Sequence, residues 1–401
     1  MFRKAEDQFI RELIFCEAHK NDYGRNLISY LKSINWNDFI TKTDQEGLSG
    51  IVFYHLQKNN LEEKLPSDVH SYLLSRYNIN IKQNLRILCQ AKRLLRQFSQ
   101  AGIPVVVLKG LALVEHNYPS LGMRGMSDID ILIRKDDLLK IDQCLALTGY
   151  TPRDSTVTKA MNSPSGYLAS LDYRKDSLSS VNLHIHWHLV NTSIPATMFA
   201  GHVDMERIWE KSVPAEIADT EARILSPEHT IIYLCEHAMR VGHSFNRLIL
   251  VCDIFQFLKK RVIAWDLVME ESRRFNLSRF VYYSLSIVNY YTGLPILSEI
   301  TTKMKPPTQT PGEKLFLHLQ LRNHRIRGSS YLLYLAMNKG LLEKCKFLYR
   351  TFFPPSQILA QKLYVNLSDS KRPDYPFRFR EVFSHFLKLL LVFFSKNVYK
   401  K

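Results

Sequence analysis

Apolar residues recur at helical spacing through the first quarter of the chain. Phe9, Leu13 and Ile14 lie three or four residues apart or side by side, so they share one face of a helix. Pro66-Ser67 follows a polar segment and is typical of the start of another helix. We therefore predict a helical N-terminal domain over residues 1–100.

Residues 101–225 mix strand and helix patterns. Val105 to Leu108 is a short apolar run rich in β-branched side chains, as in a buried strand. Ser127 to Ile133 predicts a second strand, and the strict alternation of Val181 to Leu189 predicts a third. Between the last two, Asp136 to Leu147 predicts a helix. This segment is therefore expected to form a small mixed sheet with helices.

Helical spacing returns at Ser226-Pro227, where a capping serine precedes a proline suited to the first helical position. It continues over residues 226–305, which we predict to be a helical domain packed on the core. The prolines from Pro306 to Pro311 interrupt the pattern, and residues 306–401 are expected to form a basic helical C-terminal region. The predicted fold class is α+β, with the small mixed sheet of residues 101–225 embedded between helical N- and C-terminal regions.

Two carboxylates share one face of the second predicted strand. Side chains alternate along a strand, so Asp128 and Asp130 point the same way, about 7 Å apart along it. Like charges at this distance repel unless a cation lies between them, and hard oxygen ligands suit Mg²⁺, which also binds substrate phosphates. A metal ion held there neutralises charge on a transferring phosphoryl group. A strand edge with two solvated aspartates is the alternative interpretation.

Nearby residues favour a phosphate-binding site. Lys109-Gly110 ends the first predicted strand, where a glycine lets a phosphate approach the backbone and a lysine supplies a point charge. Arg124 precedes Asp128 by four residues in a glycine-containing loop, and its guanidinium is suited to two-point contact with phosphate. Both features lie next to the paired aspartates in the predicted sheet.

The third predicted strand has one polar face, formed by Asn182, His184, His186 and His188. That face is expected to complete a site beside the two aspartates. The three histidines also allow a transition-metal site with a carboxylate of the second strand as a further ligand, since imidazole suits zinc, manganese or iron. Histidines on a half-exposed strand are often surface residues without a ligand, so both interpretations stay open.

The motifs together resemble the family described as uncharacterised nucleotidyltransferases, which belongs to the DNA polymerase beta-like nucleotidyltransferase superfamily. The resemblance covers roughly residues 5–300 and is best over residues 103–150. The segments that carry it are Leu108-Lys109-Gly110, Tyr118-Pro119, Arg124, Ser127 to Leu132, Gly149-Tyr150, Ile185-His186-Trp187, Leu225 to Glu228, Leu234 to His237, Arg247 to Asp253 and Trp265.

The resemblance implies transfer of a nucleoside monophosphate from an NTP, with ATP as the expected nucleotide, to an acceptor that the sequence does not identify. It implies that Asp128 and Asp130 hold Mg²⁺, for which Mn²⁺ can substitute, and act as catalytic residues. Lys109 and Gly110 stand where the superfamily has a phosphate-facing turn. The nucleotide-binding candidates are Lys109, Gly110, Arg124 and Ser127.

The chain departs from the superfamily pattern at two places. The superfamily usually has Gly-Ser or Gly-Gly after the first strand, where this chain has Lys109-Gly110. The superfamily also uses a third carboxylate on the adjacent strand, where this chain has His184. His184 is therefore a candidate catalytic residue, suited to general-base work near neutral pH. Two hypotheses follow: a magnesium-dependent nucleotidyltransferase, and a degenerate, non-catalytic module that binds nucleotide or serves regulation.

Four residues are secondary candidates for the site: His186, His237, Arg247 and Asp253. His237 lies among apolar neighbours on the helix after Pro227, where a buried structural histidine is the simpler interpretation. Arg247 and Asp253 flank an apolar run. They are expected either to pair with each other or with His237 and so hold helices together, or to line the nucleotide cleft.

Lys and Arg outnumber Asp and Glu by 54 to 38, which gives a formal net charge of +16. This excess favours polyanionic partners, and the basic, aromatic C-terminal region is a candidate surface for nucleic acid or anionic lipid. A solvated helical face is the alternative. The basic positions of this region are Arg322, Arg325, Arg327, Lys344, Lys346, Arg350, Lys371, Arg372, Arg378 and Arg380.

The six cysteines lie far apart and form no C-x-x-C pair, so we expect buried thiols in a reducing compartment. The first residues lack the apolar core of a signal peptide, and no apolar run approaches the roughly 18–20 residues of a membrane-spanning helix. We therefore expect a cytoplasmic protein. Walker-type loops, nucleophile elbows and dinucleotide fingerprints are absent from the sequence.

Overall fold

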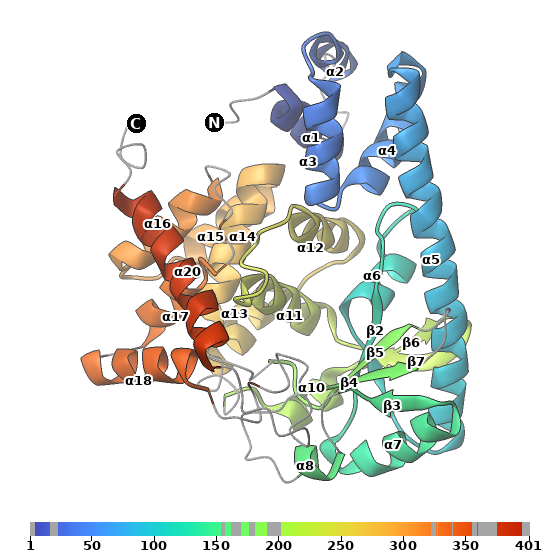
Figure 1. Ribbon diagram of the computed structural model, residues 1–401, viewed down its shortest axis with the longest axis vertical. Coiled ribbons are helices and arrows are strands. Elements are labelled where there is room, and N and C mark those ends of the chain that lie inside the picture. The colour runs from blue at the N-terminus through green and yellow to red at the C-terminus, as the bar shows by residue number, and fades with distance from the viewer. Residues whose placement is uncertain are drawn as a thin grey trace.

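The computed structural model describes residues 5–16, 23–153, 157–161, 170–175, 181–190, 202–321, 326, 328–338, 340–354, 359 and 375–394. Helices surround one mixed sheet, which confirms the predicted α+β class (Figure 1). Within these described residues, no helix has the length and apolar character needed to cross a membrane.

The N-terminal quarter is helical, as its apolar periodicity predicts. The helices are α1 (Ala5–Phe15), α2 (Tyr23–Leu31), α3 (Trp36–Gln45), α4 (Ser49–Lys58), the short 3-10 helix η1 (Glu62–Lys64) and α5 (Ser67–Gln100). Helix α5 has 34 residues, runs down one side of the molecule and contacts strands of the sheet (Figure 1). It thereby connects the N-terminal helices to the sheet.

The sheet has seven strands in the order β3-β4-β5-β2-β1-β7-β6. The pairs β2–β5 and β1–β7 are parallel and the others are antiparallel. The strands are β1 (Val106–Val107), β2 (Asp128–Leu132), β3 (Tyr150–Pro152), β4 (Ser170–Lys175), β5 (Asn182–His186), β6 (Val213–Ile217) and β7 (Thr220–Ile224). The sheet is therefore larger than the small one that the sequence predicts.

The strands that the sequence analysis missed are those with weak apolar patterns. Strands β6 and β7 form a hairpin whose turn, Ala218-Asp219, has positive φ angles of 50° and 51° without a glycine. The usual Asn-Gly or Asp-Gly signal of such a turn is absent. Strand β5 is also shorter than predicted and ends at His186, so His188 lies beyond it.

The register of the central strands decides which polar side chains meet. Asp128 lies opposite Asn182 and Asp130 lies opposite His184 on the neighbouring parallel strand. The apolar residues that alternate with them, such as Ile129 and Leu183, are buried. The polar face predicted for the third strand therefore does lie beside the two aspartates.

Helices follow and flank the strands through the rest of the chain. They are α6 (Lys109–His116), η2 (Lys135–Asp137), α7 (Leu138–Leu147), α8 (Val157–Met161), α10 (Met205–Lys211), α11 (Pro227–Met239), α12 (Ile249–Lys260), α13 (Trp265–Arg274), α14 (Ser278–Thr292), α15 (Pro295–Met304), α16 (Pro311–Leu321), α17 (Tyr331–Met337), α18 (Leu341–Phe352) and α20 (Tyr375–Phe394). The serine cap is confirmed, because Ser226 accepts a hydrogen bond from the backbone N–H of His229 at 3.2 Å. The helical spacing that runs from Asp266 to Tyr291 is divided between two helices, because Asn276 has a positive φ of 57° just after the end of α13.

Two predictions about single residue types are wrong. Only Cys235 and Cys252 of the six free cysteines are buried, and Cys16, Cys89 and Cys345 are exposed. Arg378 does not belong to a basic surface, because it is buried and pairs with Glu381. The predicted basic positions Arg322, Arg325, Arg327, Lys371 and Arg372 lie outside the described residues.

One side chain of α5 holds the loop between α6 and β2. The amide of Asn84 donates hydrogen bonds to the carbonyls of Leu121 and Arg124, both at 2.7 Å. Its carbonyl accepts from the backbone N–H of Met126 at 3.0 Å. Asn80, one turn earlier, donates to the carbonyl of Gly122 at 2.9 Å. Because Asn84 is fully buried, these bonds fix the loop that carries Arg124.

We predict that Asn84→Ala lowers the free energy of unfolding by about 2–3 kcal/mol, because it leaves buried backbone groups without partners. Urea denaturation measures this change. Asn37→Ala, at an exposed position of α3, is the matched control and should stay within about 0.5 kcal/mol of the wild type. Equal stability of the two variants would contradict the role given to Asn84.

Candidate active site

A buried carboxylate, that of Asp130, lies at the centre of the candidate site. The residue is 2% exposed. Its Oδ1 atom is 3.0 Å from Nε2 of His186, 3.1 Å from Nζ of Lys109 and 3.3 Å from Nδ1 of His184. These contacts compensate the charge of a carboxylate that is removed from water.

Lys109 reaches Asp130 from the junction of β1 and α6. Its φ of 24° lies in a region that costs a residue with a side chain about 1–2 kcal/mol. Burial alone would lower the pKa of Lys109, but the carboxylate of Asp130, with smaller contributions from Tyr233 and Asp128, raises it. Lys109 is therefore charged, and the ion pair offsets the cost of its backbone conformation.

Asp128 lies on the same face of β2 and is only partly buried. Its Oδ2 atom is 3.2 Å from Nδ1 of His184, and its Oδ1 atom accepts a hydrogen bond from the Ser127 hydroxyl at 3.0 Å. The two aspartates thus converge on one imidazole nitrogen. This is the convergence that side-chain alternation along the strand predicts.

His184 carries the charge that balances these carboxylates when no metal ion is bound. Burial disfavours its imidazolium, but the hydrogen bond to Asp130 and the carboxylates of Asp130, Asp172 and Asp128 outweigh burial and raise the pKa of His184 to about 9. The neighbouring His186 differs, because burial dominates there and lowers its pKa. At neutral pH, His184 is therefore protonated in the metal-free protein and is not the free base that the sequence suggests.

The donor atoms of Asp130, His184 and His186 lie within 4.8 Å of one another, close enough to hold one metal ion. Asp128 adds a second carboxylate beside them. His188 lies beyond the end of β5 and is not part of this cluster, and its Nδ1 atom is 3.1 Å from both the backbone nitrogen and the carbonyl oxygen of Val190. The cluster of three histidines considered from the sequence is therefore wrong. A mixed set of carboxylates and imidazoles takes its place and fits a divalent cation.

Glu115, Asp172 and Asp176 are the acids that could take the place of the third carboxylate expected from the resemblance. Asp172 of β4 comes closest to that place. It lies opposite His184 in the sheet, and its Oδ1 atom is 3.7 Å from Nε2 of His184. It therefore faces the far nitrogen of the imidazole rather than the aspartate pair. Glu115 points elsewhere and accepts a hydrogen bond from the backbone N–H of Ala218 at 2.8 Å. Asp176 lies outside the described residues.

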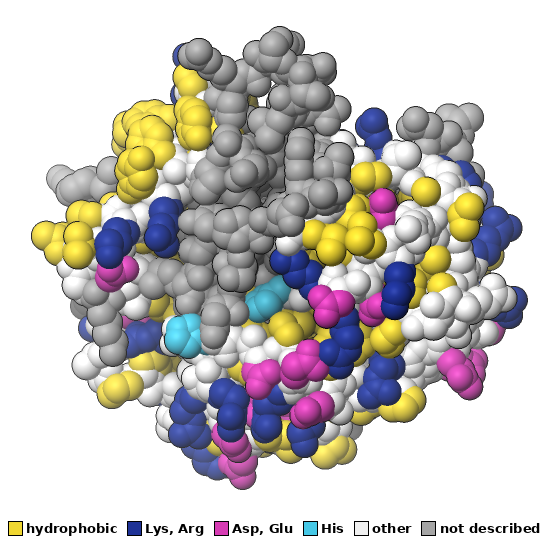
Figure 2. Space-filling view, turned by 90° about the horizontal axis from the view of Figure 1, so that it is seen from below, with side chains coloured by type: hydrophobic (Ala, Val, Ile, Leu, Met, Phe, Trp, Pro, Cys, Tyr) yellow, Lys and Arg dark blue, Asp and Glu magenta, His cyan; other side chains and the backbone are white. Residues whose placement is uncertain are grey.

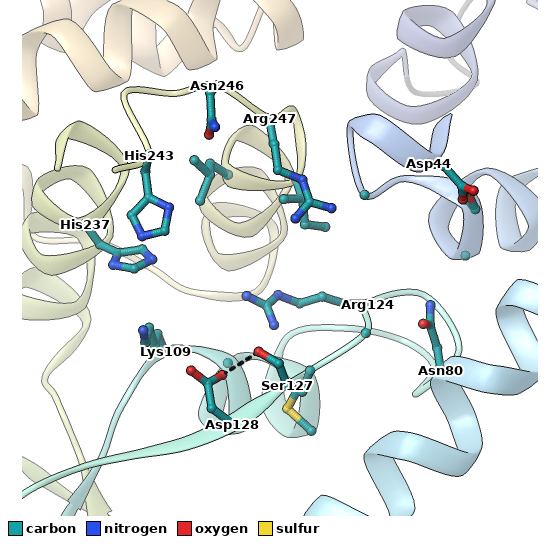
Figure 3. A pocket seen from close by; sticks show the side chains of 18 of the residues that line it. Asp44, Asn80, Lys109, Arg124, Ser127, Asp128, His237, His243, Asn246 and Arg247 are labelled. Carbon is teal, nitrogen blue, oxygen red and sulfur yellow. Dashed lines mark hydrogen bonds between the residues drawn. The ribbon is translucent and has the colours of Figure 1, made fainter. Parts of the chain in front are cut away.

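A pocket of about 380 Å³ is lined by Asp128 and Asp130, and Figure 3 shows Asp128 at its wall. Three parts of the chain line it: the α3–α4 junction with α5, the segment from Lys109 to Asp130, and the region from α11 to α12. Its lining residues are Asp44, Gly47, Ser49, Gly50, Arg76, Asn80, Lys109, Gly110, Arg124, Gly125, Met126, Ser127, Asp128, Asp130, His237, His243, Asn246, Arg247, Ile249 and Leu250.

Arg124 crosses the pocket and is held by Asp253 of α12. Its Nε and Nη2 atoms donate to the two carboxylate oxygens of Asp253 at 2.6 and 2.9 Å, and the Tyr118 hydroxyl donates to the same carboxylate at 2.7 Å. Its remaining nitrogen, Nη1, lies 3.3 Å from the position that a Cβ atom on Gly110 would take. A side chain at residue 110 would therefore crowd the guanidinium.

Arg247 lies at the opposite wall of the pocket (Figure 3). Its Nε atom donates to the carbonyl of Gln45 at 3.1 Å, and its Nη2 atom would be 2.5 Å from a Cβ atom on Gly47. The predicted pairing of Arg247 with Asp253 is therefore wrong, because Asp253 is engaged by Arg124. The alternative prediction placed Arg247 in the wall of a cleft, and Arg247 does line the pocket.

His237 also borders the pocket, next to His243 (Figure 3). The two ring centroids are 4.3 Å apart. Burial, together with the positive charges of Lys109, His243 and Arg240, holds the pKa of His237 well below its usual range. Its Nδ1 atom is buried and has no hydrogen-bond partner among the residues that the structure describes. His237 is thus a neutral imidazole with an unused polar atom at the pocket wall.

Several pocket residues were missed by the sequence analysis. Arg76 and Asn80 are separated by four residues on α5, and Asn84 follows at the same spacing, so a polar stripe along a helix was the available signal. Asp44 comes from a distant part of the sequence and contacts Arg76 at 3.3 Å. His243, Asn246 and Ile249 have no comparable pattern.

The chain is an α+β protein in which an aspartate pair of a mixed sheet lies at a pocket between helical segments, next to the basic side chains of Lys109, Arg124 and Arg247. Residues 32–293, more than half of the chain, match a family described as uncharacterised nucleotidyltransferases. The chain therefore belongs to this family, as its motifs predict. No curated protein matches the chain.

The raised pKa of His184 predicts a pH-dependent stability in metal-free protein. A histidine whose pKa rises from about 6.5 to about 9 on folding stabilises the protein fully below pH 6.5, and the contribution is lost as the pH rises through 9. Urea denaturation in chelator at these two pH values should show a loss on the order of 2–3 kcal/mol that His184→Asn lacks. An identical loss in both proteins would contradict the contacts described for His184.

Proposed function

We propose that the protein transfers a nucleoside monophosphate from an NTP, with ATP as the expected nucleotide, to an acceptor group. In this reaction the acceptor oxygen bonds to the α-phosphorus, the bond to pyrophosphate breaks, and the acceptor loses a proton. One observation carries the proposal: Asp128 and Asp130 lie side by side at the wall of a pocket that also contains Lys109, Arg124 and Arg247. The two carboxylates would hold the cation, and the three basic side chains would bind the phosphates of the nucleotide.

Mg²⁺, or Mn²⁺ in its place, is the ion proposed for the aspartates. When bound, it neutralises charge on the transferring phosphoryl group and on the pyrophosphate. Carboxylate oxygens of Asp128 and Asp130 would hold it, and His184 stands next to both. The neighbouring imidazoles make Mn²⁺, which accepts both oxygen and nitrogen ligands, a good substitute.

The cationic groups of the pocket would bind and orient the phosphates. The N-terminus of α6, at Lys109 and Gly110, borders the pocket and favours anions. Two nitrogens of Arg124 are taken by Asp253, which leaves Nη1 to face a phosphate beside Gly110. Arg247 would contact the phosphates from the opposite wall. Nδ1 of His237, which has no partner among the described residues, offers a further hydrogen-bonding atom.

A second function, nucleotide binding without turnover, is favoured by a specific contact. Lys109 Nζ lies 3.1 Å from Asp130 Oδ1 and occupies an oxygen that a metal ion would use. His184 also stands where the superfamily has its third acid. In this alternative the pocket binds an NTP for regulation. Calorimetry of NTP binding and an assay of pyrophosphate release together separate the two functions. Tight NTP binding without pyrophosphate release supports the non-catalytic module, and pyrophosphate release supports the nucleotidyltransferase.

We predict that Asp128→Asn lowers pyrophosphate release from an NTP with Mg²⁺ by at least about 100-fold, because a ligand to the metal ion is lost. Asp128 is the better position to change, since Asp130 is buried among cations and its loss also affects folding. Asp136→Asn, at an exposed position between β2 and α7, is the matched control and should keep full activity.

Equal pyrophosphate release by Asp128→Asn and the wild type would contradict the proposed reaction. Acceptors are screened in the same assay by transfer of label from an α-labelled NTP. If wild-type protein releases no pyrophosphate with any acceptor yet binds the NTP, the non-catalytic alternative stands.

We predict that Arg247→Met weakens NTP binding by about 10- to 100-fold, the loss expected when charge-assisted hydrogen bonds to phosphate are removed. Calorimetry measures the dissociation constant. Arg273→Met is a matched control, because Arg273 is also exposed and also donates Nε to a backbone carbonyl, that of Met269, but lies outside the pocket. Unchanged affinity in Arg247→Met would place the phosphates elsewhere.

A further inference from the structure

Two C-terminal helices, α18 and α20, expose large apolar side chains to solvent. On α20 the exposed fractions are 53% for Phe377, 44% for Phe379, 50% for Phe383, 43% for Leu387 and 63% for Leu391. On and next to α18 the exposed side chains are Leu341, Leu342, Tyr349 and Phe353. These nine residues are called the α18–α20 face below.

The exposed residues of α20 form one stripe. Phe379, Phe383, Leu387 and Leu391 follow one another at intervals of four residues, so they share a side of the helix. On the other side of α20, Val382 and Leu389 are buried. The helix therefore packs with one apolar side and presents a second apolar side outward, which a helix with a solvated outer face does not do.

Ring contacts join the two helices into one surface. Phe379 lies 5.2 Å from Phe352 of α18 and 5.8 Å from Phe383, measured between ring centroids. Phe353, just after α18, lies 6.4 Å from Tyr375 at the start of α20. The exposed aromatic side chains of both helices are thus continuous, and contiguous apolar surface of this kind marks an interaction site.

Basic side chains accompany the apolar ones. Arg380 lies three residues from both Phe377 and Phe383, so it shares their side of α20, and Lys388 lies three residues from Leu391. On α18 the corresponding basic residue is Arg350, which is exposed and lies three residues from Phe353. Among the described residues none of these three forms an ion pair, whereas Lys346 pairs with Glu343 and Arg378 with Glu381.

Figure 2, seen from below, shows hydrophobic side chains gathered at the left, the side on which α18 and α20 lie in Figure 1, with Lys and Arg side chains beside them. Basic side chains next to exposed Phe and Leu fit one kind of partner, the surface of an anionic bilayer. Apolar side chains enter the acyl boundary of a bilayer, while Lys and Arg extend to anionic headgroups.

We propose that the α18–α20 face binds the surface of a membrane rich in anionic lipid, with α20 lying in the plane of the interface. The leucines decide between this partner and nucleic acid, because Leu387 and Leu391 neither stack on bases nor contact phosphates. Arg350, Arg380 and Lys388, which form no ion pair among the described residues, make a neutral apolar partner a poor fit. The proposal does not depend on the pocket and concerns where the protein works rather than its reaction.

Sedimentation of the full-length protein with vesicles tests the proposal. Binding is expected to vesicles of phosphatidylcholine mixed with phosphatidylserine, and to be weak on phosphatidylcholine alone and at high salt. Phe383→Gln with Leu387→Gln should weaken binding by at least about 100-fold, since two apolar side chains no longer enter the membrane. Arg380→Gln with Lys388→Gln should weaken it about 30-fold, from about 1 kcal/mol for each basic residue near the surface.

The controls replace apolar residues of other parts of the chain that are even more exposed. Leu147→Gln with Val262→Gln removes side chains that are 85% and 95% exposed, and should leave vesicle binding unchanged. Circular dichroism checks that each variant is folded. The proposal is overturned if the wild type does not sediment with vesicles of any composition. It is also overturned if the double variant of Phe383 and Leu387 binds vesicles as well as the control variant does. Binding of single-stranded oligonucleotides without vesicle binding, or self-association through this face, would overturn it as well.

Discussion

The geometry of the candidate site depends on the contacts that compensate the buried negative charge of Asp130. Asp130 is 2% exposed, and its Oδ1 atom meets Lys109, His184 and His186. Removing a partner from a buried ion pair typically costs about 3–5 kcal/mol, because an uncompensated charge remains. The carboxylate therefore ties the β1–α6 junction to β2 and β5. A cation that binds Asp130 would compete with Lys109 for the Oδ1 atom.

Helices far away in the sequence complete the pocket in front of that carboxylate. Asn84 of α5 holds the loop that carries Arg124, and Asp253 of α12 takes two nitrogens of its guanidinium. Arg247 is set against Gly47, where a side chain would collide with it. The flanking helices are thus part of the site, since they decide which nitrogen atoms remain for a ligand.

Local patterns predicted the aspartate pair and the helical N-terminus, because alternation and helical spacing act within a few residues. The family resemblance, rather than a local pattern, gave the expectation that His184 lies on the strand next to the aspartates, and the parallel β2–β5 register shows His184 opposite Asp130. The hairpin β6–β7 was missed because its turn lacks glycine, and the partner of Asp253 was predicted wrongly because that contact joins residues 129 positions apart. Long-range pairing of this kind depends on the tertiary fold, and no spacing rule encodes it.

The central claim is that Asp128 and Asp130 hold a metal ion against the phosphates of a nucleotide. A crystal structure with Mn²⁺ and a non-hydrolysable NTP analogue, with the anomalous signal of manganese recorded, tests it most directly. The account predicts a manganese peak between the two carboxylates and a triphosphate directed toward Arg124 and Arg247. Manganese absent from both aspartates, or a nucleotide bound outside this pocket, would contradict it.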